Sequence, residues 1–66
     1  MTPYYARLVL GWTPGTPVEQ ALLAAMRAGS WDDLQRLAQG WPDLVSVFLL
    51  LRDQPEQVAM LARRIH

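Results

Sequence analysis

The chain has 66 residues, of which 52% are hydrophobic. This apolar content is too high for a disordered segment, and the length suits one small domain with a marginal core. The 6 basic and 6 acidic residues cancel, which argues against nucleic acid as a partner recognised by bulk charge. The chain contains no cysteine, so disulfides and thiolate metal sites are excluded.

No apolar run in the sequence approaches the roughly 20 residues that a membrane-spanning helix needs. The first residues also lack the basic segment and apolar stretch of a signal peptide. We therefore expect a single cytoplasmic domain over residues 1–66, in which residues 1–15 form an N-terminal segment of uncertain structure.

Residues 2–12 are compatible with a helix or with a strand. Thr2 as N-cap, Pro3 at the first helical position and Gly11 at the end favour a helix. Aromatic and branched residues at alternate positions would instead suit a strand, which would require a partner edge. We favour a short helix over residues 3–10.

The next helix has the clearest start in the sequence. After the Pro-Gly turn of residues 13–16, Thr16 can cap a helix with Pro17 at its first position and Glu19 closing a capping box. The helix is expected to run to about Ala28 and to end at Gly29. Its predicted buried side consists of Val18, Ala21, Leu22, Ala25 and Met26.

A third helix is predicted to begin at once, with Ser30 as its cap and Asp33 as the acidic partner of that cap. Gly40 is expected to end this helix. Its predicted inner stripe consists of Trp31, Leu34, Leu37 and Ala38. So short a link between two amphipathic helices predicts an antiparallel hairpin.

The run from Trp41 to Arg52 is the most hydrophobic stretch of the chain. Pro42 at the first helical position and Asp43 beside it are typical of a helix start. At about 100° per residue, Val45 and Leu49 point away from the main apolar face, so this helix carries more apolar surface than one core face uses. The predicted inner face consists of Leu44, Val47, Phe48 and Leu51.

The last helix is predicted from about Gln54 to Ile65, with Asp53 as its cap. Met60 falls on its polar side. The residues expected to be buried are Val58, Leu61, Ala62 and Ile65. The sequence therefore predicts an all-α fold with four short helices, or five with the N-terminal segment, arranged as two antiparallel helical hairpins.

Small residues at Ala25 and Ala38 flank a Gly-polar-aromatic turn at residues 29–31. This pattern, from Ala25 to Trp41, resembles the central part of a tetratricopeptide helical hairpin. Leu34 stands where that family usually has Ala, and no proline closes the repeat at the expected spacing. The resemblance implies a protein-binding module similar to the small helical chaperones of bacterial secretion systems.

Residues arranged for catalysis are not apparent in the sequence. It has no glycine-rich phosphate loop, and its single histidine, His66, is the last residue. Asp32 and Asp33 are adjacent, so on a helix they diverge by about 100° and fit the first turn rather than a facing carboxylate pair. We expect no enzyme activity, no cofactor and no metal site.

Three explanations for the surplus apolar surface remain open. The run from Trp41 to Arg52 can be the central helix of the core, with the N-terminal segment over Val45 and Leu49. These two residues, with Trp12, Trp41 and Met60, can instead bind another protein or a second copy of the chain. Membrane contact is the third explanation, and the lack of a basic polar face on this helix argues against it.

The sequence-based hypothesis is therefore a non-enzymatic protein-interaction module that acts as an adaptor, small chaperone or inhibitor. The alternative is a small DNA-associated regulator of phage or plasmid type. The apolar helix offers Leu, Val and Phe where side chains that read bases would be Arg, Asn or Gln, which argues against that alternative.

Overall fold

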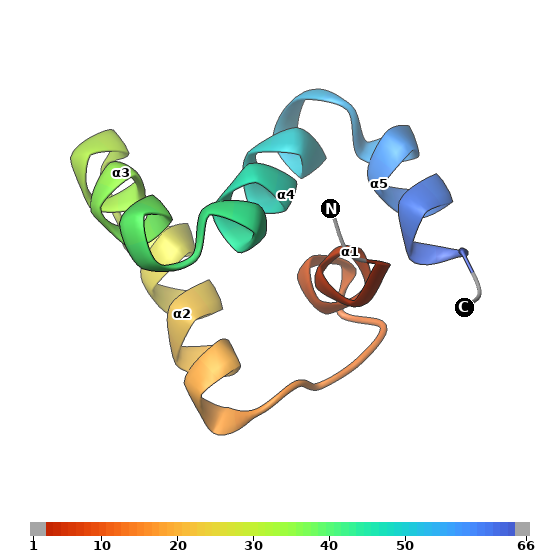
Figure 1. Cartoon of the computed structure of the whole chain (residues 1–66), viewed down its shortest axis with the longest axis horizontal. Helices are drawn as coiled ribbons and strands as arrows, with labels where there is room; N and C mark the ends of the chain where they lie inside the picture. The colour runs from red at the N-terminus through yellow and green to blue at the C-terminus, as the bar shows by residue number, and fades with distance from the viewer. Residues whose placement is uncertain (1–2, 65–66) are drawn as a thin grey trace.

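Five α-helices follow one another along residues 3–64, which are the residues that the computed structural model describes (Figure 1). They are α1 (Pro3–Leu10), α2 (Pro17–Ala28), α3 (Trp31–Gly40), α4 (Pro42–Asp53) and α5 (Pro55–Ala62). The predicted all-α class is confirmed for this part of the chain, and residues 3–10 form a helix rather than a strand. The predicted cap Thr2 and the predicted buried residue Ile65 lie outside the described residues.

Proline marks the starts of most helices. Pro3, Pro17, Pro42 and Pro55 are the first residues of α1, α2, α4 and α5. At this position the missing N–H has no intrahelical partner to lose, and the fixed φ of proline suits the helix. The sequence therefore sets these starting points locally, before any tertiary contact forms.

Reciprocal capping boxes fix the starts of α2 and α3, as predicted. Thr16 N donates to Glu19 Oε1 at 2.8 Å, and Glu19 N donates to Thr16 Oγ1 at 3.1 Å. Ser30 N donates to Asp33 Oδ2 at 3.1 Å, and Asp33 N donates to Ser30 Oγ at 3.4 Å. Each box satisfies two backbone donors that an uncapped helix would leave unpaired.

Gly11 ends α1, as the sequence predicts. Its φ is +79°, and its N–H donates to the Leu8 carbonyl at 3.1 Å, while Trp12 N–H donates to the Arg7 carbonyl at 2.8 Å. These two bonds form a Schellman motif, which requires a left-handed residue that glycine supplies without strain.

The helix α4 is the centre of the fold. It packs against α1, α3 and α5, and α1 also packs against α5. Figure 1 shows α1 and α5 on one side of α4, with α2 and α3 on the other. This agrees with the first explanation in making the apolar run a central core helix, although residues of α3, not of the N-terminal segment, line the hollow beside Val45 and Leu49. The arrangement as two antiparallel hairpins is not confirmed, because α2 and α3 are not among the extensively packed pairs.

The buried face of α2 differs from the predicted one. Leu23 and Met26 are buried, whereas Val18 is 63% exposed and Ala21 and Ala25 are exposed as well. The prediction is confirmed for Met26, and Leu22 is half-buried, but the rest of the predicted face is rotated by about one residue from the observed one. Apolar residues surround most of this helix, so periodicity alone does not select the side that meets the core.

The junction between α4 and α5 also differs from the prediction. Asp53 is the last residue of α4, and Gln54 is the N-cap of α5 without a side-chain cap hydrogen bond. Asp53 was predicted to be this cap, and that prediction is wrong. The backbone bond from Gln54 N–H to the Leu50 carbonyl, at 2.7 Å, extends the hydrogen bonding of α4 past the aspartate.

Arg7 joins the two ends of the described chain. Its Nε donates to the Ala62 carbonyl at 2.7 Å, and its Nη2 donates to the Arg64 carbonyl. Carbonyls at the end of a helix lack intrahelical donors and carry partial negative charge, so a guanidinium suits this position. The side chain of α1 therefore caps the C-terminal end of α5.

Candidate protein-binding site

An apolar hollow of about 160 Å³ lies where α3 packs against α4. Leu34 and Val45 are buried within it at 3% and 4% exposure, and Leu49 is half-buried. Trp31 is 59% exposed at its edge. The complete lining is Trp31, Leu34, Gln35, Ala38, Val45, Ser46 and Leu49. The hollow therefore joins an exposed indole to the hydrophobic core, and we refer to it as the α3–α4 hollow.

A second hollow, of about 290 Å³, continues this surface toward the end of α4. It shares Trp31 and Leu49 with the α3–α4 hollow and adds Arg52 and Asp53. The two hollows thus form one surface with an apolar part between the helices and a charged part at one end. Apolar centres with polar rims are typical of protein interfaces.

Local structure holds Trp31 at the edge of this surface. The Ser30–Asp33 capping box fixes the first turn of α3, in which Trp31 is the first residue. Gly29 precedes the cap, and a Cβ there would lie 2.8 Å from the Ala25 carbonyl oxygen. The same Cβ would lie 3.0 Å from the Asp33 Cβ, so the close contact between the end of α2 and the start of α3 favours glycine at this position.

The sequence places Val45 and Leu49 away from the inner face of α4 and leaves open what covers them. In the structure Val45 is buried and Leu49 is half-buried. The covering element is α3, which contributes Leu34 and Ala38 to the same hollow. Because residue Trp41 alone separates the two helices, α3 packs directly onto this side of α4.

The other predicted binding residues lie apart from the α3–α4 hollow. Trp12 follows α1 and is 52% exposed, and Trp41, between α3 and α4, is 42% exposed. Met60 is 68% exposed on α5, where it lines a separate hollow of about 270 Å³ with Gln57, Leu61 and Arg64. The five predicted residues therefore do not all line the same hollow.

Trp31 was predicted to lie on the inner stripe of its helix, and this prediction is wrong because its side chain is exposed. One sequence signal does point to this exposure. A residue directly after an N-cap has its side chain directed back past the helix start, where the neighbouring helix no longer covers it. Leu34, one turn further along α3, is buried at 3% exposure.

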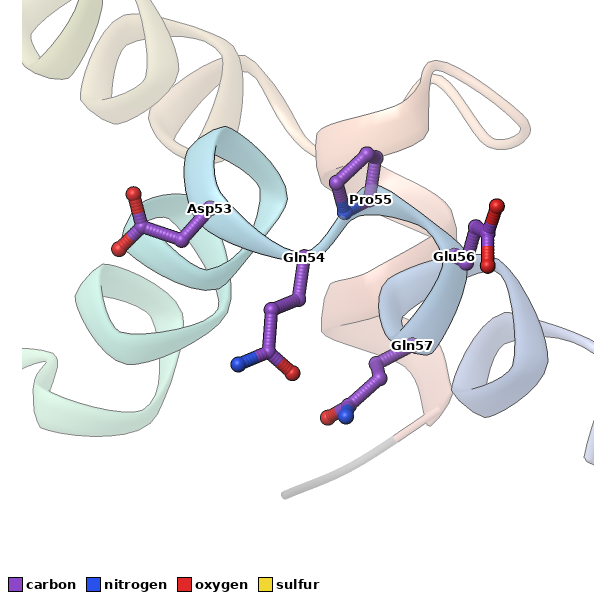
Figure 2. Close-up of a pocket in the computed structure, with 5 residues that line it drawn as sticks. All are labelled: Asp53, Gln54, Pro55, Glu56 and Gln57. Atoms are coloured by element: carbon purple, nitrogen blue, oxygen red, sulfur yellow. The ribbon is translucent and has the colours of Figure 1, made fainter.

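The turn between α4 and α5 carries a larger but polar hollow of about 380 Å³, lined by residues 53–57 (Figure 2). Figure 2 shows the carboxylates of Asp53 and Glu56 pointing to opposite sides of the turn. They therefore cannot share a proton or a cation. Among residues 3–64, no group of three or more His, Cys, Asp and Glu is placed to hold a metal ion.

A hydrogen bond links α1 to the start of α2. The Tyr4 hydroxyl donates to Glu19 Oε1 at 2.6 Å, and the same oxygen accepts the Thr16 N–H. The bond from Tyr4, followed by that from Thr16, holds the pKa of Glu19 below its ordinary value of 4.5. The same bond raises the pKa of Tyr4 above 10.0. This pair positions α2 and lies outside the α3–α4 hollow.

The chain covers its core without a partner. A folded monomer of 7.5 kDa is expected to expose roughly 4,200 Å². The accessible surface here is 4476 Å², close to that value.

Comparisons with known proteins give no assignment: no protein-family model matches the chain, and neither curated proteins nor solved structures provide a match. Within the part of the chain that the structure describes, none of the helices is both long and apolar enough to cross a bilayer.

Proposed function

We propose that this protein is a non-enzymatic interaction module that acts as an adaptor, small chaperone or inhibitor. Its α3–α4 hollow binds an apolar side chain of a partner protein. The observation that carries the proposal is the placement of Trp31, an indole 59% exposed beside a hollow with buried leucine and valine side chains. An exposed tryptophan next to an apolar hollow is an arrangement typical of binding hot spots.

The size of the hollow supports a side chain rather than a free small molecule as its occupant. Its volume of about 160 Å³ is below the roughly 300–1,000 Å³ of pockets that enclose drug-sized ligands. A single leucine- or phenylalanine-sized anchor from a partner helix suits this space. Arg52 and Asp53 then lie at the rim, where charges contribute to orientation more than to affinity.

The resemblance of the stretch from Ala25 to Trp41 to a tetratricopeptide hairpin supports the same class of function, because that family binds proteins. Trp31 belongs to the turn that carries this resemblance. The two arguments are independent, since one uses residue types and the other uses exposure and an adjoining hollow. Cytoplasmic location is part of the proposal.

Ser46→Arg tests the proposal with little effect on the core. Ser46 is exposed and lines the hollow, so a long charged side chain there obstructs the pocket without removing a buried group. Gln39→Arg is the matched control, because Gln39 is an exposed residue of α3 outside the lining. Thermal unfolding of both variants should follow the wild type within a few degrees.

The measurement is affinity capture from the native host with quantitative mass spectrometry, followed by titration of the purified partner. We expect at least one protein to bind the wild type and Gln39→Arg but to be lost with Ser46→Arg. Loss of a hot-spot contact should weaken that binding about 30-fold or more. Equal binding to all three chains would show that the hollow is not the binding site.

A further inference from the structure

The exposed side of α5 carries a charge pattern that is complementary to itself. Glu56 lies in the first turn, Met60 in the middle, and Arg64 just after the helix end. Glu56 and Met60 are four residues apart on α5, so their side chains differ by only about 40° in direction. Arg64, beyond the helix end, lines the same hollow as Met60, so the three residues follow one another along one side of α5 and its end. Met60 is 68% exposed, and no acidic residue lines the hollow around it. We refer to these three residues as the α5 stripe.

We propose that the α5 stripe binds the same stripe of a second copy of this chain, with the two helices antiparallel about a two-fold axis at Met60. In that arrangement, residues equally distant from Met60 face each other. Glu56 of each chain faces Arg64 of the other, and the two Met60 side chains meet at the axis. Such an interface is isologous, as closed dimers require.

The helix dipole alone does not explain this pattern. An acidic residue at the start and basic residues after the end of a helix suit its own dipole. That account leaves open why the residue between them is a methionine on the solvent side. Methionine is flexible and polarizable, and it suits an adaptable contact with a partner surface. The second copy provides one explanation for both the charges and Met60.

Contacts within the chain hold the basic end of the stripe in place. The Arg7 guanidinium binds the backbone carbonyls of Ala62 and Arg64. Arg64 N–H also donates to the Leu61 carbonyl at 3.2 Å, which continues the helical turn past Ala62. The backbone of Arg64 is thus ordered before association, which reduces the entropy lost on pairing.

The proposed dimer is weak because its interface is short. An α5 of 8 residues is about 12 Å long, so the pair buries much less than the roughly 800 Å² per partner of a standard interface. We expect a dissociation constant between about 10 µM and 1 mM at physiological salt. Raising the salt concentration should weaken the dimer, since its ion pairs are exposed.

Charge reversal tests the pairing directly. Glu56→Arg places two arginines opposite each other in both halves of the dimer, and Arg64→Glu places two glutamates opposite each other. Each variant alone should dimerise about tenfold more weakly or worse. An equimolar mixture should form a heterodimer at near wild-type affinity, because both facing pairs are then of opposite charge. The readout is sedimentation equilibrium of each variant and of the mixture.

Met60→Glu supplies a second test, because it places like charges at the two-fold axis, and Met60→Leu is its matched control. Met60→Glu should abolish the dimer, while Met60→Leu should retain it. A wild-type chain that is monomeric at about 1 mM would overturn the proposal, and so would a dimer insensitive to these substitutions. Ser46→Arg lies outside α5 and should leave the dimer intact, so the outcome is independent of the proposed function.

Discussion

Replacing the half-buried Arg7 by methionine should destabilise the protein far more than removing the charge of an exposed arginine. The substitution retains an unbranched apolar stem but removes the donors that bind the Ala62 and Arg64 carbonyls. A hydrogen bond with one charged partner contributes about 1.5–3 kcal/mol when buried, and less when exposed. The bond to Ala62 is partly buried, and the bond to Arg64 is exposed. We therefore expect a loss of about 2–3 kcal/mol.

This loss is large relative to the total stability. At roughly 0.05–0.15 kcal/mol per residue, a chain of 66 residues has a free energy of unfolding of about 3–10 kcal/mol. For a domain of this size, Arg7→Met should lower the midpoint of thermal unfolding by about 10–20 °C. Arg7→Lys keeps the charge but has one ammonium group for two carbonyls, so it should lower the free energy of unfolding by about half as much as Arg7→Met.

The assay is urea unfolding followed by tryptophan fluorescence and by far-ultraviolet circular dichroism. Arg36→Met is the matched control, because Arg36 is an exposed residue of α3, and it should change stability by less than about 0.5 kcal/mol. Hydrogen exchange should also show reduced protection in the last turn of α5. A loss for Arg7→Met no greater than that of the control would refute the assignment of Arg7 as the cap of α5.

Other expected effects concern the turn between α1 and α2 and the orientation of α2. Gly15→Ala should lower the free energy of unfolding by about 2 kcal/mol or more, because φ there is +69° and a Cβ would lie 2.5 Å from the Leu8 side chain. Gly11→Ala should lower it by only about 1 kcal/mol, because φ there is +79° but the space around a Cβ is open. Thermal unfolding distinguishes the two. Tyr4→Phe should raise the pKa of Glu19 toward its ordinary value, as measured by NMR titration. In the wild type, the stabilisation from the lowered pKa of Glu19 is present above pH 4.5 and is lost as the pH falls through the pKa of Glu19 in the folded protein. Tyr4→Phe should therefore make the stability less sensitive to acid. Leu23→Ala should cost about 2–5 kcal/mol in urea unfolding, and a change below 1 kcal/mol would contradict the observed orientation of α2.

Helix starts were predictable from the sequence because their causes are local. The boxes at Thr16 and Ser30 use residues three positions apart, and proline at the first position restricts the backbone by itself. The end of α1 at Gly11 is equally local. The start of α5 was less predictable, since Asp53 and Gln54 are both polar residues before a proline and only the hydrogen bonds of α4 distinguish them.

Helix orientation was not predictable where a helix is apolar on several sides. The predicted face of α2 includes Val18, Ala21 and Ala25, which are exposed, and Met26, which is buried together with Leu23. Leu23 and Met26 have the larger side chains, and burying them gains more free energy than burying alanine. Side-chain size was therefore a better guide than periodicity.

The cover over Val45 and Leu49 comes from α3, the helix that directly precedes α4 in the chain. Trp41 is the single residue between α3 and α4, and these two helices pack against each other. Leu34 and Ala38 then reach this side of α4. The second apolar face of α4, which carries Val45 and Leu49, packs against α3. Most of the apolar surface of α4 that exceeds one core face is therefore covered.

The two proposed surfaces are compatible, because they share no residue. The α3–α4 hollow is lined by residues of α3 and α4, whereas the α5 stripe is made of Glu56, Met60 and Arg64. A dimer formed through α5 would therefore present two α3–α4 hollows. A partner with two suitable anchor side chains could occupy both hollows at once and would bind the dimer more tightly than the monomer. This gain in avidity would hold even though the dimer alone dissociates at low concentration. In that case Glu56→Arg would weaken capture of a bivalent partner and leave the affinity for a single anchor peptide unchanged.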